Sequence, residues 1–345
     1  MNPLMTSLML SSLALGSIIT MSSFHWLIAW IGLELNTLAI IPIIAKQHHP
    51  RATEATTKYF LTQAAASAMV LFASTTNAWH TGTWDIMQLT NQPACIMLAM
   101  ALSMKLGLAP LHFWLPEVLQ GSSLKTALII TTWQKLAPIS LLYLTHNSMN
   151  TAVLLTMGLM STLTGGWGGL NQTQTRKIMA FSSIAHLGWM ASILTLAPNI
   201  MLLNLMLYLM MTISTFMLLI FSSSKNIQDL TTSWTISPPT TAIMLILLMS
   251  LGGLPPLTGF MPKWLILQEL TTHSLSTTAT IMALSALLSL FFYLRLSYMT
   301  ALTLFPNSTQ SSYKWRFQPK LKTTAMTTML MLSTLLLPMT PMLTA

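Results

Sequence analysis

The sequence predicts an all-α polytopic membrane protein with about 11 transmembrane helices, because a helix needs about 20 residues to cross the hydrocarbon and roughly 30 with its connection. Of the 345 residues, 53% are apolar, and the mean hydropathy is +0.65. Only 6% are charged, whereas an ordinary soluble domain carries about 25% charged residues. So few charges cannot cover a water-facing surface of this size, which excludes a soluble enzyme and a disordered chain.

The individual helices are predicted from apolar runs separated by proline, glycine and charged residues. They cover residues 3–21, 24–45, 56–78, 94–114, 124–144, 150–169, 177–195, 199–221, 240–270, 276–298 and 323–343. The first run lacks a basic leading segment and a small-residue cleavage site, so we expect it to remain as a helix.

The basic residues fall on one side of this predicted topology. The loops after every second helix, with the adjoining helix ends, hold 12 of the 15 Lys and Arg residues: Lys46, Arg51, Lys58, Lys125, Arg176, Lys177, Lys225, Arg295, Lys314, Arg316, Lys320 and Lys322. The opposite loops hold none. This side, called the basic side below, is predicted to face inward together with the N-terminus, and the C-terminus outward. The net charge of +9 therefore indicates orientation rather than nucleic-acid binding.

Four ionisable residues remain inside predicted helices: Glu34, Lys105, Lys135 and Lys263. A Lys or Asp at a helix centre costs about 2.5 to 3.5 kcal/mol on insertion scales, and such groups are functional by default. Glu34 and Lys105 lie at similar depth and are predicted to form a switchable pair, with a static packing ion pair as the alternative. Lys135 has no acidic neighbour in sequence, so it either exchanges protons or extends its amine to the membrane surface.

Two predicted helices are interrupted. Residues 252–262 contain three glycines and three prolines and directly precede Lys263, and Pro110 interrupts residues 94–114 just before His112. Plain proline kinks are the simpler interpretation. Paired broken helices in the two halves of a chain also indicate an inverted repeat with a site at its interface.

His112 and His186 are candidate proton relays near neutral pH, although a hydrogen-bonded packing role is nearly as compatible with either. Two deep histidines do not suggest a haem site. The single cysteine, Cys95, leaves no set of ligands for an iron–sulfur centre and no disulfide partner. Glu54 and Lys58, four residues apart, are interpreted as a solvated helix pair. The row of deep charges therefore predicts a proton carrier without a redox cofactor, driven from elsewhere.

Six segments carry a resemblance to a known family over nearly the whole chain. They are residues 30–34 (Trp-Ile-Gly-Leu-Glu), 50–60, 105–117, 168–174, 176–186 and 252–259 (Gly-Gly-Leu-Pro-Pro-Leu-Thr-Gly). In these segments the chain resembles the antiporter-like membrane subunits of respiratory complex I. The resemblance implies two inverted five-helix repeats, at residues 1–148 and 149–299, then a basic inner loop and a closing helix at 300–345. The first three helices of the longer family members are absent.

The resemblance also implies a function and a setting. The chain would be a subunit of NADH:ubiquinone reductase that conducts protons, with Glu34 and Lys105 as the coupling pair, Lys135 as the central proton site and Lys263 near the outlet. NADH, FMN, iron–sulfur clusters and ubiquinone would belong to other subunits, and this chain would hold no cofactor and no metal. Its partners would be other membrane-arm and accessory subunits and lipids, with no nucleic acid and no soluble substrate except protons.

The implied location is the mitochondrial inner membrane, with the N-terminus on the matrix side and the C-terminus on the intermembrane side. Two other functions remain open at this point. An independent cation/proton antiporter is disfavoured by the shortage of deep carboxylates, and a purely structural scaffold would tolerate replacing all three deep lysines.

Overall fold

A computed structural model describes residues 3–47, 49–235, 238–302 and 324–339, and the regular elements in these ranges are all helices. The α-helices are α1 (Pro3–Ser22), α2 (Trp26–Ile44), α3 (Pro50–Thr81), α4 (Gln92–Leu106), α5 (Trp114–Gly121), α6 (Leu124–Thr131), α7 (Trp133–Leu144), α8 (Thr151–Gly169), α9 (Thr175–Ile193), α10 (Pro198–Phe221), α11 (Ile227–Thr231), α12 (Pro238–Gly252), α13 (Phe260–Thr272), α14 (Ser276–Leu302) and α15 (Thr324–Leu335). Short 3₁₀ turns and two isolated β-bridges complete the connections.

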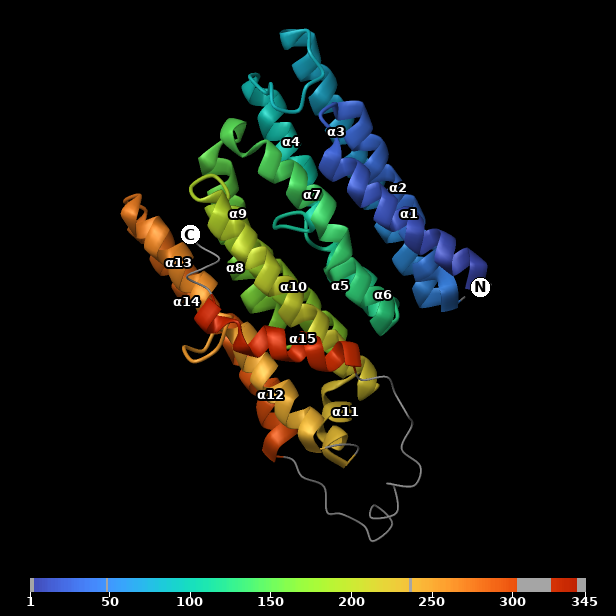
Figure 1. Cartoon of the computed structure of the whole chain (residues 1–345), viewed down its shortest axis with the longest axis vertical. Coiled ribbons are helices and arrows are strands. Elements are labelled where there is room, and N and C mark those ends of the chain that lie inside the picture. Colours follow the sequence, from blue (N-terminus) through green and yellow to red (C-terminus); the bar gives the residue numbers. More distant parts are fainter. Residues whose placement is uncertain (1–2, 48, 236–237, 303–323, 340–345) are drawn as a thin grey trace.

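The helices form an elongated bundle whose long members run in nearly one direction (Figure 1). In that view α1, α2 and α3 lie on one side, α4 to α7 follow, and α12 to α14 lie on the other side beyond α8, α9 and α10. The prediction of an all-helical membrane protein is confirmed, since five segments are long and apolar enough to cross a membrane: Pro3–Ser22, Trp26–Ile44, Leu124–Leu144, Pro198–Phe221 and Ser276–Ala301.

The two predicted breaks are both present and have the same geometry. α4 ends at Gly107 (φ +80°) and α12 ends at Gly253 (φ +83°), and a positive φ is accessible to glycine at little cost. In each case the glycine and the following residue donate backbone hydrogen bonds back into the last helical turn, as in a Schellman motif. The interruptions are therefore helix terminations followed by new helices, α5 and α13, rather than the simple proline kinks of the alternative interpretation.

A third break was not predicted. The expected helix at 124–144 is divided into α6 and α7 at Thr132, whose ψ of −72° departs from the ideal helical value. The Lys135 amide donates to the Thr132 carbonyl at 3.3 Å instead of to Thr131 one residue earlier. The Thr131 carbonyl is thereby released from the helical ladder.

The last predicted helix differs from its expectation of 323–343. Within the described ranges it is helical over Thr324–Leu335, which lies across α10 in Figure 1 instead of parallel to it. A proline at position 338 explains the early end, because proline cannot continue the hydrogen-bond ladder. Residues 340–343 and the predicted loop residues Lys314, Arg316, Lys320 and Lys322 lie outside the described residues.

The apolar core consists of two clusters, and the deep ionisable residues lie where the two meet. The first cluster includes Ile44, next to the basic loops, and the second occupies the other half of the bundle. Along α6 and α7, Ile130 belongs to the first cluster and Ala137 to the second, with Lys135 between them. His186 is flanked in the same way. A polar layer therefore crosses the bundle at middle height.

Candidate functional site

Three lysines in this layer are removed from solvent: Lys105 is 6% exposed, Lys135 2% and Lys263 8%. Lysine is almost never buried to this extent unless its amine is paired. Each lysine lies beside a point where a helix is interrupted, at α4, α6–α7 and α12–α13. Interrupted helices expose backbone carbonyls, so the breaks provide acceptors where the sequence places the amines.

The Lys135 amine is held by a tyrosine of α10. Its Nζ donates to the Tyr208 hydroxyl oxygen at 3.3 Å and lies 5.2 Å from the centre of the Tyr208 ring. The Tyr208 hydroxyl in turn donates to the Thr131 carbonyl at 3.1 Å. This is the carbonyl that the α6–α7 break releases, so the unpredicted break anchors the hydroxyl that receives Lys135.

His186 of α9 continues this arrangement toward the second half of the chain. Its ring packs on Tyr208 with 5.4 Å between the ring centres. It also lies beside the Leu251 carbonyl and within electrostatic range of both Lys135 and Lys263. His186 therefore lies between the two buried lysines, and its role as a proton relay stays a prediction.

Lys263 is held by the end of α12. Its Nζ donates to the Gly252 carbonyl at 2.9 Å and to the Leu251 carbonyl at 3.4 Å. In a continuous helix these carbonyls would accept from the residues four positions later, but positions 255 and 256 are prolines, which have no N–H. The proline pair thus frees two acceptors for the lysine.

Lys105 and Lys135 line the same cavity, whose volume of about 10 Å³ is at the lower limit for one water molecule. The Lys105 amine has no hydrogen-bond partner in the described part of the chain. A buried polar group without a partner is rare unless water reaches it. The polar lining also includes Asn36, Thr37, Tyr59, Gln63 and Gln134.

Glu34 and Lys105 are not in direct contact, as no ion pair joins them within the described ranges. Glu34 nevertheless acts electrostatically on Lys105, and its Oε2 is buried without a partner. The two charges are therefore coupled across a gap, and their behaviour as a switchable pair stays a prediction.

His112 lies apart from this row. It belongs to the turn between α4 and α5, where its ring packs on Phe113 with 4.4 Å between the ring centres. Its Nδ1 is buried without a partner, and it does not line the cavity of Lys105 and Lys135. Among the described residues, no group of three or more His, Cys, Asp and Glu side chains could hold a metal ion.

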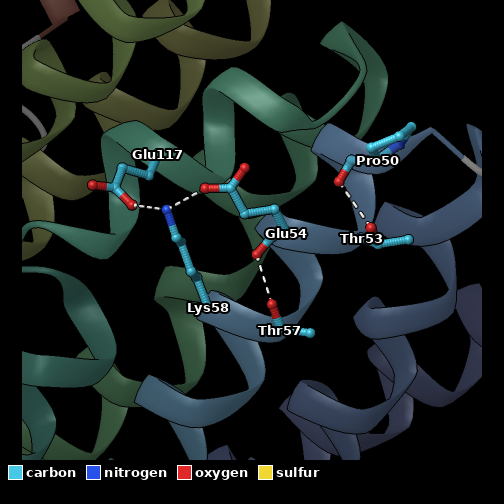
Figure 2. A network of polar contacts seen from close by, with 6 residues as sticks. All are labelled: Pro50, Thr53, Glu54, Thr57, Lys58 and Glu117. Carbon is cyan, nitrogen blue, oxygen red and sulfur yellow. Dashed lines mark hydrogen bonds and ion pairs between the residues drawn. The ribbon is translucent and has the colours of Figure 1, made fainter.

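A second polar cluster lies at the basic end of α3 (Figure 2). α3 has 32 residues, which is about 48 Å of helix against a hydrocarbon thickness of about 30 Å, so its charged first turns lie outside the hydrocarbon. Lys58 donates to Glu54 at 2.5 Å, as the predicted helix pair, and also to Glu117 of α5 at 2.7 Å. Glu117 and Glu54 together raise the pKa of Lys58 to about 12, and Lys58 lowers the pKa of Glu54.

Sequence reasoning missed Tyr208 as a member of the buried row. The usable signal was a single hydroxyl-bearing ring in the middle of a strongly apolar helix, α10, at the same depth as His186. A buried tyrosine hydroxyl normally finds a hydrogen-bond partner, and the lysine supplies it here.

The fold and this layer define a class: a multi-pass helical membrane protein with interrupted helices and a transverse row of buried lysine, tyrosine and histidine. Residues 23–289 match the family model described as NADH:quinone oxidoreductase/Mrp antiporter, TM, and residues 290–344 match NADH dehydrogenase subunit 2 C-terminus. The chain is also 58% identical over 342 residues to NADH-ubiquinone oxidoreductase chain 2 of Xenopus laevis, covering 99% of both chains.

Solved structures show the same fold. A chain of respiratory complex I from Thermus thermophilus with bound aureothin matches with a TM-score of 0.84 and 26% identity, over 98% of this chain and 79% of that one. A chain of the Mrp complex from Dietzia sp. matches in fold at 17% identity with a TM-score of 0.74, over 86% of this chain and 60% of that one. The chain belongs to the family of NADH-ubiquinone oxidoreductase chain 2.

Proposed function

We propose that this chain conducts protons through the row of Lys105, Lys135, Tyr208, His186 and Lys263. As a chain 2 family member it is a subunit of NADH:ubiquinone oxidoreductase, respiratory complex I, and works with the other subunits of that complex. NADH oxidation and ubiquinone reduction take place in those other subunits, and their free energy drives the protons. This chain itself holds no redox cofactor, since its row consists of groups that exchange protons rather than electrons.

The observation that carries the proposal is the chain of neighbours from Lys135 to Lys263. Lys135 donates to the Tyr208 hydroxyl, the Tyr208 ring packs on His186, and His186 lies beside the Leu251 carbonyl that accepts from Lys263. Two unit charges about 7 Å apart interact by roughly 2.4 kcal/mol at an effective dielectric constant near 20. Protonation of one member therefore alters the proton occupancy of the next, and displacement of charge travels along the row.

Glu34 and Lys105 are proposed as the input end of this row. When Glu34 carries a charge, it favours the protonated form of Lys105. Movement of that charge releases the Lys105 proton toward Lys135 through the cavity that both lysines line. His112, which lies off the row, is assigned a packing role between α4 and α5, and Lys263 the last step before the outlet.

The setting follows from the family. We propose the mitochondrial inner membrane, with the N-terminus in the matrix, the C-terminus in the intermembrane space, and membrane-arm subunits, accessory subunits and lipids as neighbours. The matching terminations of α4 and α12 at Gly107 and Gly253 support inverted five-helix repeats over 1–148 and 149–299, and 300–345 would provide the basic loop and the closing segment of about 11 spans.

The test is Glu34→Gln in the assembled complex, measured as NADH-driven quinone reduction together with proton pumping in proteoliposomes. We expect a lower coupled rate at normal assembly, because the amide keeps the shape of the carboxylate and removes its charge. Glu269→Gln, near the end of α13 and about 9 Å of helix beyond Lys263, is the matched control, because Glu269 lines neither the cavity of Lys105 and Lys135 nor the end of α12. Unchanged pumping in the Glu34→Gln complex contradicts the proposal.

The fold similarity to a chain of the Mrp complex makes an independent cation/proton antiporter the second candidate. This function predicts sodium or potassium flux through the purified chain without other subunits. The buried row offers amines to a cation and only Glu34 as a carboxylate, and an amine repels a cation whenever it is protonated. Proton transport without sodium or potassium flux therefore favours the first candidate.

A further inference from the structure

Two separate spaces lie on either side of the contact between α3 and α5. The outer one is a pocket of about 310 Å³ at the basic side, lined by charged residues that include Arg51, Lys58, Glu117 and Lys177. The inner one is the small cavity of Lys105 and Lys135. The two spaces share no lining residue, so they are not connected in this conformation.

Two aromatic rings occupy that position. Tyr59 follows Lys58 directly on α3, and Trp114 lies one turn before Glu117 on α5. The ring centres are 5.7 Å apart with an angle of 66° between the planes, an edge-to-face contact. Both rings line the inner cavity and neither lines the outer pocket, so the pair forms the wall between them.

The inner face of this wall is polar. Gln63 lies one turn beyond Tyr59 on the same buried face of α3 and lines the cavity. It is 4% exposed, and its Nε2 has no hydrogen-bond partner within the described residues. An unpaired buried amide indicates that water visits the cavity. On the basic side, the route for such water is closed by the ring pair in this conformation.

The outer face carries one inter-helix ion pair. Lys58 contacts two carboxylates, but the two contacts differ in what they connect: Glu54 lies on the same helix, whereas Glu117 lies on α5 (Figure 2). The Lys58–Glu117 contact at 2.7 Å therefore holds α5, and with it Trp114, against α3. On the other side of Trp114, its indole Nε1 donates to the Met104 carbonyl at 3.0 Å, at the end of α4.

We propose that protons and water enter the Lys105–Lys135 cavity from the basic side between α3 and α5, with the Tyr59–Trp114 ring pair as the gate and the Lys58–Glu117 ion pair as its latch. The gate rests on the proposed proton conduction, for which it supplies the entry. Separation of the rings joins the pocket to the cavity, and re-formation of the ion pair closes it. Tyr59, Trp114, Lys58 and Glu117 are positioning residues and carry no proton in this scheme.

The experiment measures access to the cavity directly, without turnover. In the assembled complex, the native Cys95 is replaced by serine and a reporter is introduced by Ala137→Cys, at a buried cavity-lining position. A small, charged, membrane-impermeant thiol reagent is added to one side at a time. We expect slow labelling of the reporter from the basic side and none from the other. Thr37→Cys, also in the cavity wall, serves as a second reporter if the first prevents assembly.

Two added substitutions test the gate and the latch. Tyr59→Ala is expected to raise the labelling rate from the basic side by about tenfold or more, since access no longer waits for the rings to separate. Glu117→Gln is expected to raise it by up to about fivefold, the upper end of the range for loss of an exposed ion pair. Glu54→Gln, which removes a charge from the same lysine but no contact between helices, should leave the rate unchanged. Phe216→Ala, in the same apolar cluster but lining neither space, controls for general loosening.

The outcomes are separable. Labelling only from the opposite side, or no effect of Tyr59→Ala, overturns the gate. Equal effects of Glu117→Gln and Glu54→Gln overturn the latch. Failure of proton conduction as the function appears instead as unchanged pumping in the Glu34→Gln complex, a measurement that does not depend on cavity labelling.

Discussion

Replacing Tyr208 by phenylalanine removes one oxygen atom from the middle of the buried row. The ring remains, so the packing on His186 and the contact of the Lys135 amine with the ring face are kept. Two hydrogen bonds are lost: the one from Lys135 at 3.3 Å and the one to the Thr131 carbonyl at 3.1 Å. The substitution therefore tests the hydroxyl separately from the ring.

The expected decrease in the rate of proton transfer follows from those two hydrogen bonds. Side-chain hydrogen bonds inside membrane proteins contribute on average about 0.6 and at most about 1.7 kcal/mol each. Two of them amount to about 1.2 to 3.4 kcal/mol. At about 1.36 kcal/mol per tenfold change in rate, proton transfer between Lys135 and His186 slows by about 8- to 300-fold. Coupled NADH oxidation and proton pumping should fall together.

The assay compares NADH-driven quinone reduction and proton uptake in proteoliposomes containing the assembled complex. Tyr143→Phe is the control, because it removes a hydroxyl from a ring that stacks on His146 at the end of α7 and takes no part in the row. The reasoning is refuted if Tyr208→Phe assembles normally and pumps within about a factor of two of the unmodified complex. It is also refuted if Tyr143→Phe is equally impaired.

Three further predictions concern other parts of the chain. Gly121→Ala places a Cβ at 2.5 Å from the Arg51 carbonyl oxygen, so we expect overpacking to destabilise the fold by about 1 to 3 kcal/mol. The measurement is the thermal midpoint of the complex, which should fall. Gly252→Ala is the control and should be tolerated, because its Cβ would lie 3.7 Å from the nearest atom. Glu117 and Glu54 raise the pKa of Lys58 from 10.5 to about 12, so at pH 9 its side chain holds about 30-fold less free amine than an unpaired lysine. Acylation followed by mass spectrometry should therefore show Lys58 reacting more slowly than Lys46. Glu117→Gln should reduce this difference in rate. The raised pKa also means that the ion pair is intact at neutral pH and is lost only as the pH rises through about 12. Lys263→Met removes the donor to the Gly252 carbonyl and should abolish coupled pumping, whereas Lys225→Met on the exposed basic side should not; equal rates for the two variants would contradict the assigned place of Lys263 in the row.

The sequence was sufficient to predict most helices because hydropathy and helix-ending residues act locally. The two breaks were predicted from Pro110 and from the glycines and prolines of residues 252–262, and the structure places the helix ends at Gly107, three residues before Pro110, and at Gly253. The burial of Lys105, Lys135 and Lys263 could also be predicted from the sequence, since it depends on position within an apolar run.

What escaped prediction depends on neighbours that are distant in sequence. Tyr208 lies 73 residues from Lys135, so its place in an apolar helix marks it as a buried hydroxyl but does not identify Lys135 as its partner. The break at Thr132 was missed because no glycine marks it, and proline follows only at position 138. The separation of Glu34 and Lys105 could not be predicted either, because equal depth in two helices does not determine how the helices are rotated toward each other.

The attachment of Lys263 to two main-chain carbonyls has a genetic consequence. Amino-acid replacement at positions 251 or 252 changes a side chain but leaves the carbonyl in place, so the acceptors of this amine cannot be deleted by a single codon change. Variation should therefore leave the acceptors in place at position 252, where an added Cβ has room, whereas Leu251 is restricted by its own burial in the apolar core and the prolines that follow are restricted because they free the two carbonyls. A hydrogen-bond acceptor supplied by the main chain is therefore less sensitive to substitution than one supplied by a side chain.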